Sequence, residues 1–235
     1  MTAFPDVTAA TAYSPERRVQ PARIRRVLNV GSGPALSGRL HAAFHGGGWD
    51  EVRLDIDPRV LPDLVGSMTD MRGLVADGSF DAVWSSHNVE HLYAHEVVPA
   101  LQEFRRVLAD TGFALITCPD LERVCQMVIA DDLDNVAYMS PAGPITPLDM
   151  LFGHSKSIES GNEFMAHNTG FTAKRLGRLI LEAGFAEARV AAGPAWDLWA
   201  LGLMPRADLA EVYVTLRGTA QARLAEQIEA GSASA

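Results

Sequence analysis

The chain is poor in cysteine and has no long apolar run. Its 235 residues include two cysteines. Because no signal-peptide pattern opens the sequence, we expect Cys118 and Cys125 to be reduced thiols in a cytoplasmic protein. A membrane-spanning helix requires roughly 20 apolar residues, and no stretch approaches that length. These shortages argue against a disulfide-stabilised secreted domain and against a membrane segment.

The chain also has fewer basic than acidic residues. Lysine and arginine total 20 against 29 acidic residues, a formal net charge of −9. Binding to nucleic acid needs a clustered basic face, and the basic cluster of this chain precedes the first predicted strand. That cluster consists of Arg17, Arg18, Arg23, Arg25 and Arg26, and we interpret it as a solvated segment. The composition therefore predicts no nucleic-acid partner.

Apolar residues are plentiful, at 48% of the chain, which is enough for the core of one α/β domain. We expect this domain over residues 23–218. An N-terminal tail or cap should precede it at 1–22, and a helix with a flexible end should follow at 219–235. Within it, the Pro-, Gly- and Met-rich stretch 131–168 exceeds ordinary connection lengths, which is typical of a functional lid. We assign this stretch to substrate enclosure.

The chain is organised around the sequence RVLNVGSGPAL, residues 26–36. A buried strand breaks into Gly31-Ser32-Gly33-Pro34 before an amphipathic stretch, 36–44, that predicts a helix. Glycines allow a tight turn and a close approach of backbone N–H groups to a ligand. Proline suits the first turn of a helix, whose N-terminus carries partial positive charge. The motif therefore predicts a ligand with a negatively charged end.

Two common nucleotide motifs are incomplete or missing. A dinucleotide site wants a third glycine where this chain has Leu36, and no Gly-Lys-Ser/Thr of a P-loop follows the turn. Asp55 ends the second predicted strand, where a carboxylate can accept both hydroxyls of a ribose. Asp57 is expected to cap a short helix opened by Pro58. These features indicate a nucleoside ligand without a pyrophosphate.

Four motifs in order resemble class I S-adenosylmethionine-dependent methyltransferases: VLNVGSGPA, LDIDP, FDAVWSSHNVEHL and FRRVLADTGFALITCPD. The resemblance implies an α/β fold, a Rossmann-like doubly wound sheet of about seven mostly parallel strands. It also implies S-adenosyl-L-methionine as the cofactor, whose lack of phosphate explains the missing third glycine. The candidate cofactor-binding residues are Asn29, Gly31, Ser32, Gly33, Asp55, Ile56, Asp57, Ser67, Met68, Ser85, Ser86 and His87, with Ser67 standing where the family often has an acidic residue.

The remaining pattern predicts the other elements of the fold. Strands are expected at 63–66, 80–85 and 113–118, and helices at 97–108, 121–130, 171–184 and 221–230. The long insertion follows the fifth strand. The last two strands, 185–191 and 210–216, should form an antiparallel edge hairpin whose link carries Trp196 and Trp199. Thr172 and Gly184 are expected to cap the helix between them.

Histidines supply the candidate catalytic groups. His87 directly follows the fourth strand, and His154 and His167 lie in the insertion, so these are the candidate bases for a hydroxyl or amine acceptor. His87, His91 and His95 would share one face if their segment were helical. The H-E-x-x-H order of a zinc site is absent, since the run reads H-N-V-E-H, and we expect no metal site.

We therefore expect a methyltransferase that acts on a small molecule by in-line displacement. The alternatives are a non-methylating transferase or cyclase that uses the same cofactor, a cofactor-binding partner subunit without turnover, and an NAD-dependent protein. The acceptor and the oligomeric state are left open.

Overall fold

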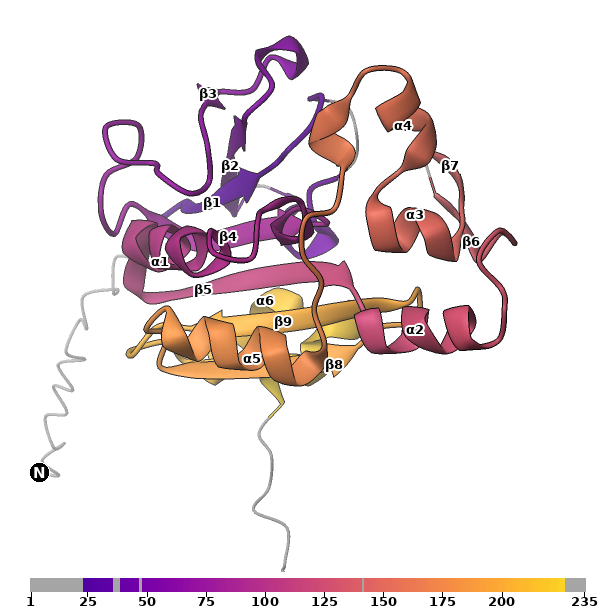
Figure 1. Cartoon of the computed structure of the whole chain (residues 1–235). Helices are drawn as coiled ribbons and strands as arrows, with labels where there is room; N and C mark the ends of the chain where they lie inside the picture. The colour runs from indigo at the N-terminus through magenta and orange to yellow at the C-terminus, as the bar shows by residue number, and fades with distance from the viewer. Residues whose placement is uncertain (1–22, 36–38, 47, 141, 227–235) are drawn as a thin grey trace, which may run out of the picture.

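A seven-stranded sheet in the order β3-β2-β1-β4-β5-β9-β8 forms the centre of the molecule (Figure 1). The computed structural model describes residues 23–35, 39–46, 48–140 and 142–226. The strands are β1 (Arg25–Val30), β2 (Trp49–Asp55), β3 (Leu64–Val65), β4 (Phe80–Ser86), β5 (Leu108–Pro119), β8 (Glu187–Ala192) and β9 (Asp197–Leu203). The first five run parallel, whereas β9 is antiparallel to both β5 and β8. The expected Rossmann-like sheet with an antiparallel edge hairpin is confirmed.

Helices cover both faces of the sheet. Successive residues of β1 point to opposite faces, so Leu28 packs in the cluster of α1 (Val97–Val107) and α5 (Ala173–Glu182), while Val27 packs in the cluster of α6 (Leu209–Leu216). Burial on both faces explains why β1, β4 and the second half of β5 are rich in apolar residues. Thr172 accepts a hydrogen bond from the Arg175 N–H, which confirms its capping role.

The expected helix over 36–44 does not form as such. Residues 36–38 lie outside the described part of the chain, and the rest contributes only a 3₁₀ turn, η1 (Ala42–Phe44), capped by His41. Phe44 is buried against Trp49 and Phe113. Among the described residues 39–44, the apolar side chains that suggested a helix thus reach the core from a short turn.

The last strand was placed wrongly. Residues 197–203, expected to be a link, form β9, and residues 210–216 lie in helix α6. The β-branched content of 210–216 suggests a strand, but Val212, Thr215 and Leu216 are buried at helical spacing, and Asp208 caps the helix by accepting from the Ala210 N–H. The expected helix over 221–230 is instead the 3₁₀ helix η5 (Ala220–Ala225), and residues 227–235 lie outside the described part.

The insertion forms a small unit of its own beside the sheet (Figure 1). After α2 (Leu121–Ile129) it contains β6 (Tyr138–Ser140), β7 (Gly143–Ile145), α3 (Pro147–Phe152), α4 (Ser155–Glu159) and the 3₁₀ turn η4 (Glu163–Met165). Val124, Ile145 and Met150 form its core. Because α2 begins directly after β5 ends, the unit stands at the carboxyl ends of the parallel strands, where ligands bind in such sheets.

Among the described residues, no helix combines the length and the apolar character needed to cross a bilayer. Cys118 is buried, Cys125 is exposed, and both are free.

Candidate functional site

A cavity of about 300 Å³ opens at the carboxyl ends of β1 and β2, and we call it the first cavity. Gly31 and Gly33 both line it with positive φ angles, +64° and +62°. A Cβ at Gly31 would overlap the Asn88 side chain, whose Nδ2 donates to the Val30 carbonyl at 2.7 Å. Glycine is therefore required at position 31 by conformation and by space.

Asp55 fixes the glycine turn against the end of β2. One of its carboxylate oxygens accepts from the Gly33 N–H at 2.8 Å, and the other accepts from the Asp57 N–H at 2.9 Å. A carboxylate offers about four lone-pair positions. Asp55 can thus hold the turn and still accept hydroxyl groups from a ligand in the first cavity.

Asp57 has the capping role that its position predicted. Its carboxylate accepts from the Arg59 N–H at 2.9 Å and thereby caps the 3₁₀ turn η2 (Pro58–Val60). The Arg59 guanidinium bonds to the same carboxylate at 2.8 Å, and these hydrogen bonds hold the pKa of Asp57 below its usual range. Asp57 and Ile56 both line the first cavity.

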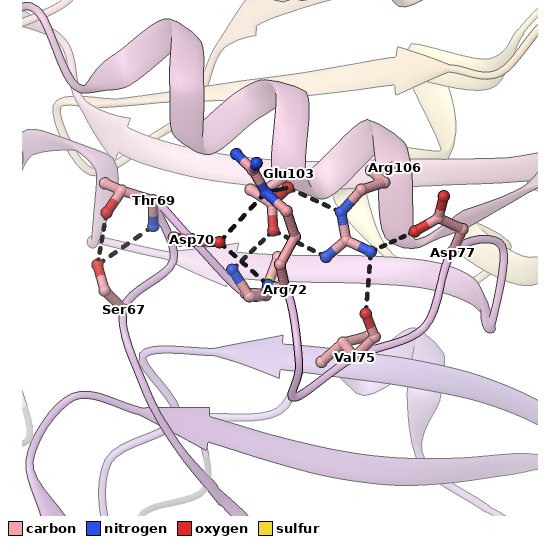
Figure 2. Close-up of polar contacts among 9 residues, drawn as sticks. Ser67, Thr69, Asp70, Arg72, Val75, Asp77, Glu103 and Arg106 are labelled. Carbon is pink, nitrogen blue, oxygen red and sulfur yellow. Dashed lines mark hydrogen bonds and ion pairs between the residues drawn. The ribbon is translucent and has the colours of Figure 1, made fainter.

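Ser67 and Met68 form another part of the wall, on the loop that follows β3. Figure 2 shows how this loop is tied to α1: the Glu103 carboxylate accepts from the Met71 N–H at 2.7 Å and from Arg106 at 2.7 and 2.8 Å. Arg106 also donates to the Val75 carbonyl at 2.9 Å. Glu103 is buried, and the hydrogen bonds of Arg106 lower its pKa. A buried ion pair therefore holds this wall.

Several predicted cofactor residues do not line the first cavity. Asn29 is buried in the sheet and donates to Glu51 Oε1 at 2.7 Å. Ser32 is buried, and its hydroxyl donates to the Gly33 carbonyl at 3.2 Å. Ser85 is fully buried, and Ser86 pairs with Thr117 in the sheet. These residues lie in the sheet or in the glycine turn, and their side chains do not line the cavity. The prediction missed Arg39, Asn88, His91 and Asn168, which do line the cavity.

His87 directly follows β4, and its backbone has a left-handed conformation with φ +49°. Its Nδ1 is 3.4 Å from Glu90 Oε1. Burial alone would lower the pKa of His87, but the Glu90 carboxylate outweighs it and raises that pKa. Glu90 is itself 1% exposed. Its burial opposes ionisation, yet the imidazoles of His87, His91 and His167 lower its pKa to about 2. Glu90 is therefore a buried carboxylate among three histidines.

The insertion brings His167 to this carboxylate. The Asn168 and Thr169 N–H groups donate to the Glu90 carbonyl at 2.9 and 3.2 Å, which fixes the end of the insertion beside η3 (Val89–His91). The ring centroids of His91 and His167 are 4.9 Å apart. Burial lowers the pKa of His167, so its imidazole favours the neutral form.

A second cavity of about 210 Å³ lies on the far side of this cluster. It is lined by residues that include Glu90, Pro119, Met150, Phe152, His167 and Asn168. Asn168 lines both cavities. The two cavities therefore meet at the histidine cluster, and the insertion contributes walls to each.

Two other histidines stand apart. His154 precedes α4, its Nδ1 is 2.7 Å from the Ser157 hydroxyl, and it lines neither cavity. His95 is exposed and stacks on Tyr93. The segment 87–95 contains a 3₁₀ turn rather than an α-helix, so the condition for three histidines on one helical face is not met.

Comparison with known proteins shows which protein family this fold and its first cavity resemble. Residues 28–116, which run from β1 through β5, match the family model described as a methyltransferase domain. The match is in agreement with the predicted resemblance to class I S-adenosylmethionine-dependent methyltransferases. No curated protein matches it significantly.

Solved structures agree on the fold of this methyltransferase domain. An S-adenosylmethionine-dependent methyltransferase from Archaeoglobus fulgidus is 14% identical, with a TM-score of 0.50 over 77% of this chain and 87% of its own. A possible exported protein from Bordetella parapertussis is 15% identical, with a TM-score of 0.50 over 77% of this chain and 62% of its own. A possible histamine N-methyltransferase from Thermotoga maritima is 16% identical, with a TM-score of 0.49 over 79% and 84%.

The residues of the first cavity fit S-adenosylmethionine, the cofactor of this domain class. The glycine turn leaves the backbone accessible, and Asp55 keeps acceptor capacity for the ribose hydroxyls. The Arg39 side chain borders the cavity beside Gly33, where a guanidinium can pair with the carboxylate of the amino-acid portion.

Proposed function

We propose that the protein transfers a methyl group from S-adenosylmethionine, held in the first cavity, to a small molecule held in the second. The observation that carries this proposal is the shared boundary of the two cavities at Asn168 and the histidine cluster. Methyl transfer from a sulfonium is an in-line displacement, so donor and acceptor must lie on either side of one opening. A boundary that both cavities share at Asn168 supports such an arrangement.

The size of the second cavity supports a small acceptor. At about 210 Å³ it lies below the 300–1,000 Å³ of typical drug-sized ligand pockets. Its walls come from η3, from the end of β5 and the segment after it, and from the insertion. Met150 and Phe152 are apolar contacts, and Glu90 and His167 are polar ones. A compact molecule with one polar group matches this lining.

Alignment is expected to supply most of the rate enhancement. Orientation of reacting groups is worth roughly 7–11 kcal/mol, whereas a general base contributes typically 10²–10⁴-fold. The insertion orients the acceptor and excludes water. His87 is the proposed base, because it lines the first cavity and because Glu90, behind it, orients the ring and stabilises its protonated form. His154 lines neither cavity and has no part in this proposal.

Binding of S-adenosylhomocysteine by isothermal titration calorimetry tests the cofactor site. We expect the Asp55→Ala variant to bind at least tenfold more weakly than the wild type, because two charge-assisted hydrogen bonds are lost. Asp50→Ala is the matched control, since Asp50 is an exposed carboxylate on the same strand. Equal affinities in all three proteins, or tighter binding of NAD than of S-adenosylhomocysteine, would contradict the proposal.

Turnover is tested with a cofactor that carries a deuterated methyl group. Mass spectrometry of a metabolite extract should show a small molecule that gains one labelled methyl group, and the His87→Gln variant should lose this activity while it keeps its affinity for S-adenosylhomocysteine. A tight cofactor complex with no labelled product would instead indicate a partner subunit without turnover.

A further inference from the structure

Glu90, His91 and His167 bring three potential metal ligands together at the boundary of the two cavities. One ligand atom from each residue lies within 4.8 Å of the other two. Small side-chain rotations would bring these atoms onto a single ion at the bond lengths of about 2.0–2.2 Å that imidazole and carboxylate ligands adopt. The spacing alone does not make a site, but two further observations point to a ligand.

The first observation concerns the tautomers of the two imidazoles. His91 Nδ1 is 3.0 Å from the Ala166 carbonyl, and His167 Nδ1 is 2.9 Å from the Met150 carbonyl. A carbonyl oxygen can only accept a hydrogen bond, so in both rings Nδ1 must carry the proton. Each neutral ring is then left with an unprotonated Nε2. Metal-binding histidines are held in the same way, with the other ring nitrogen donating to a carbonyl or carboxylate.

The second observation is the state of Glu90. Its side chain is 1% exposed, and neither carboxylate oxygen accepts a hydrogen bond from any residue in the described part of the chain. The nearest cationic partner is His87, whose Nδ1 is 3.4 Å from Oε1, beyond a good hydrogen bond. Buried charges in proteins are normally paired or coordinate a metal. Beside its ion pair with His87, the Glu90 carboxylate therefore keeps unused acceptor capacity in a place where two imidazole lone pairs are available.

We propose that Glu90, His91 and His167 form a binding site for a divalent transition-metal ion of the zinc class. Two imidazole nitrogens and one carboxylate oxygen are a ligand set that such ions favour. Three protein ligands leave coordination positions open, which is typical of a metal that binds substrate rather than one that only stabilises the fold.

The position of the site indicates what the open positions would take. His91 lines the first cavity, and Glu90 and His167 line the second. If the second cavity holds the methyl acceptor, as proposed above, an oxygen atom of the acceptor would complete the coordination and would be held next to the methyl group. The acceptor class is then a small molecule with a hydroxyl group that releases its proton to solvent on binding, because the bound oxygen keeps a lone pair for attack on the methyl group.

Zinc binding to the full chain tests the site without reference to activity. Protein treated with a chelator is titrated with Zn²⁺ by calorimetry and with Co²⁺ by visible absorption. We expect one ion per chain and the d–d bands of a nitrogen- and oxygen-ligated Co²⁺. The His167→Gln and Glu90→Gln variants should each lose at least tenfold in affinity. His154→Gln is the matched control, because His154 is in the same insertion and outside both cavities, and it should bind like the wild type.

The outcomes separate the metal site from the methyltransferase proposal. Absence of Zn²⁺ and Co²⁺ binding, or equal affinity in the wild type and all variants, overturns the metal site. S-adenosylhomocysteine affinity and circular dichroism are measured on the same samples, so a variant that has unfolded is recognised. In the titrations of the wild type and His154→Gln, metal binding without cofactor binding would support the site and contradict the proposed function. Cofactor binding without metal binding would support the proposed function and contradict the metal site.

Discussion

The two cavities are built in different ways. One wall of the first is built at the ends of β1 and β2, where the Gly33 N–H donates to Asp55, and the insertion adds residues 162–166 and Asn168 to its lining. The second depends on side chains, and His167 reaches Glu90 only because the end of the insertion is bonded to η3. The comparison teaches that the strand ends form one wall of the first cavity by themselves, whereas the second cavity and the contact between His167 and Glu90 exist only when the insertion is docked.

The largest expected effect is on the wall of the first cavity. Removing Glu103 by the change Glu103→Ala leaves the Arg106 guanidinium without its buried partner and the Met71 N–H without its acceptor. Breaking a buried ion pair in this way costs roughly 3–5 kcal/mol, so we expect a loss of about 3 kcal/mol in the free energy of unfolding, measured by urea denaturation. The exposed pair Arg178–Glu182 is the control, and Glu182→Ala should cost under about 0.5 kcal/mol. Equal losses in the two variants would refute the assigned role.

Gly31→Ala should come next, at about 2 kcal/mol. A left-handed conformation costs a non-glycine residue roughly 1–2 kcal/mol, and the new Cβ would displace the Asn88 side chain from its hydrogen bond to the Val30 carbonyl, a bond worth about 1 kcal/mol. Thermal unfolding and S-adenosylhomocysteine affinity measure the effect. In the double variant Gly31→Ala/Asn88→Ala the clash is gone, so affinity should partly recover. If the double variant is no better than the single one, steric overlap is not the cause.

The insertion is expected to respond to acid. The buried Asp149 carboxylate accepts hydrogen bonds from the N–H and hydroxyl groups of both Ser155 and Thr146. Burial alone would raise the pKa of Asp149, but these bonds lower it from 3.8 to about 2. Because the folded pKa lies below the unfolded one, the stabilisation is fully present above about pH 4 and is lost as the pH falls toward 2. The shift corresponds to about 2 kcal/mol.

Urea denaturation of the wild type and Asp149→Asn at several pH values measures this contribution. The difference in unfolding free energy should be largest near neutral pH and should shrink between pH 4 and pH 2. A difference that does not change with pH would mean that the carboxylate charge has no part in joining α3 to α4.

The difference between the two cavities also explains how much of each could be predicted from the sequence. Each parallel strand end carries a local signal, an apolar run followed by glycine, aspartate or serine, so the parallel strands and eight residues of the first cavity could be predicted from the sequence. Asn29 and Ser85 were misplaced because apolar runs locate a strand without telling which face each side chain takes. Their binding role has no support from their positions, whereas Asp55, Ser67 and His87 lie in the cavity wall.

On the acceptor side, the sequence predicted a role for the insertion and for His167 but not the contact of His167 with Glu90 and His91. In the sequence alone, Glu90 and His91 have the pattern of a structural Glu-His pair. Only the folded structure shows that His167 of the insertion lies beside them, because no spacing rule links residues so far apart in the chain. The expectation of no metal site rested on such a spacing rule. Likewise, residues 210–216 read as a strand because β-branched content was weighed above the helical spacing of the buried residues Val212, Thr215 and Leu216.

The smallest expected effect concerns Arg39, which lies on the exposed rim of the first cavity. If its guanidinium pairs with the carboxylate of the cofactor, Arg39→Ala should weaken S-adenosylhomocysteine binding by about twofold to fivefold, as expected for an exposed ion pair worth roughly 0.2–1 kcal/mol. The loss should fade in high salt, because exposed charges are screened. Methylthioadenosine, which has no carboxylate, should bind the wild type and the variant equally. An equal loss for both ligands would place Arg39 against the adenosine instead, and the carboxylate would then be held by main-chain N–H groups alone.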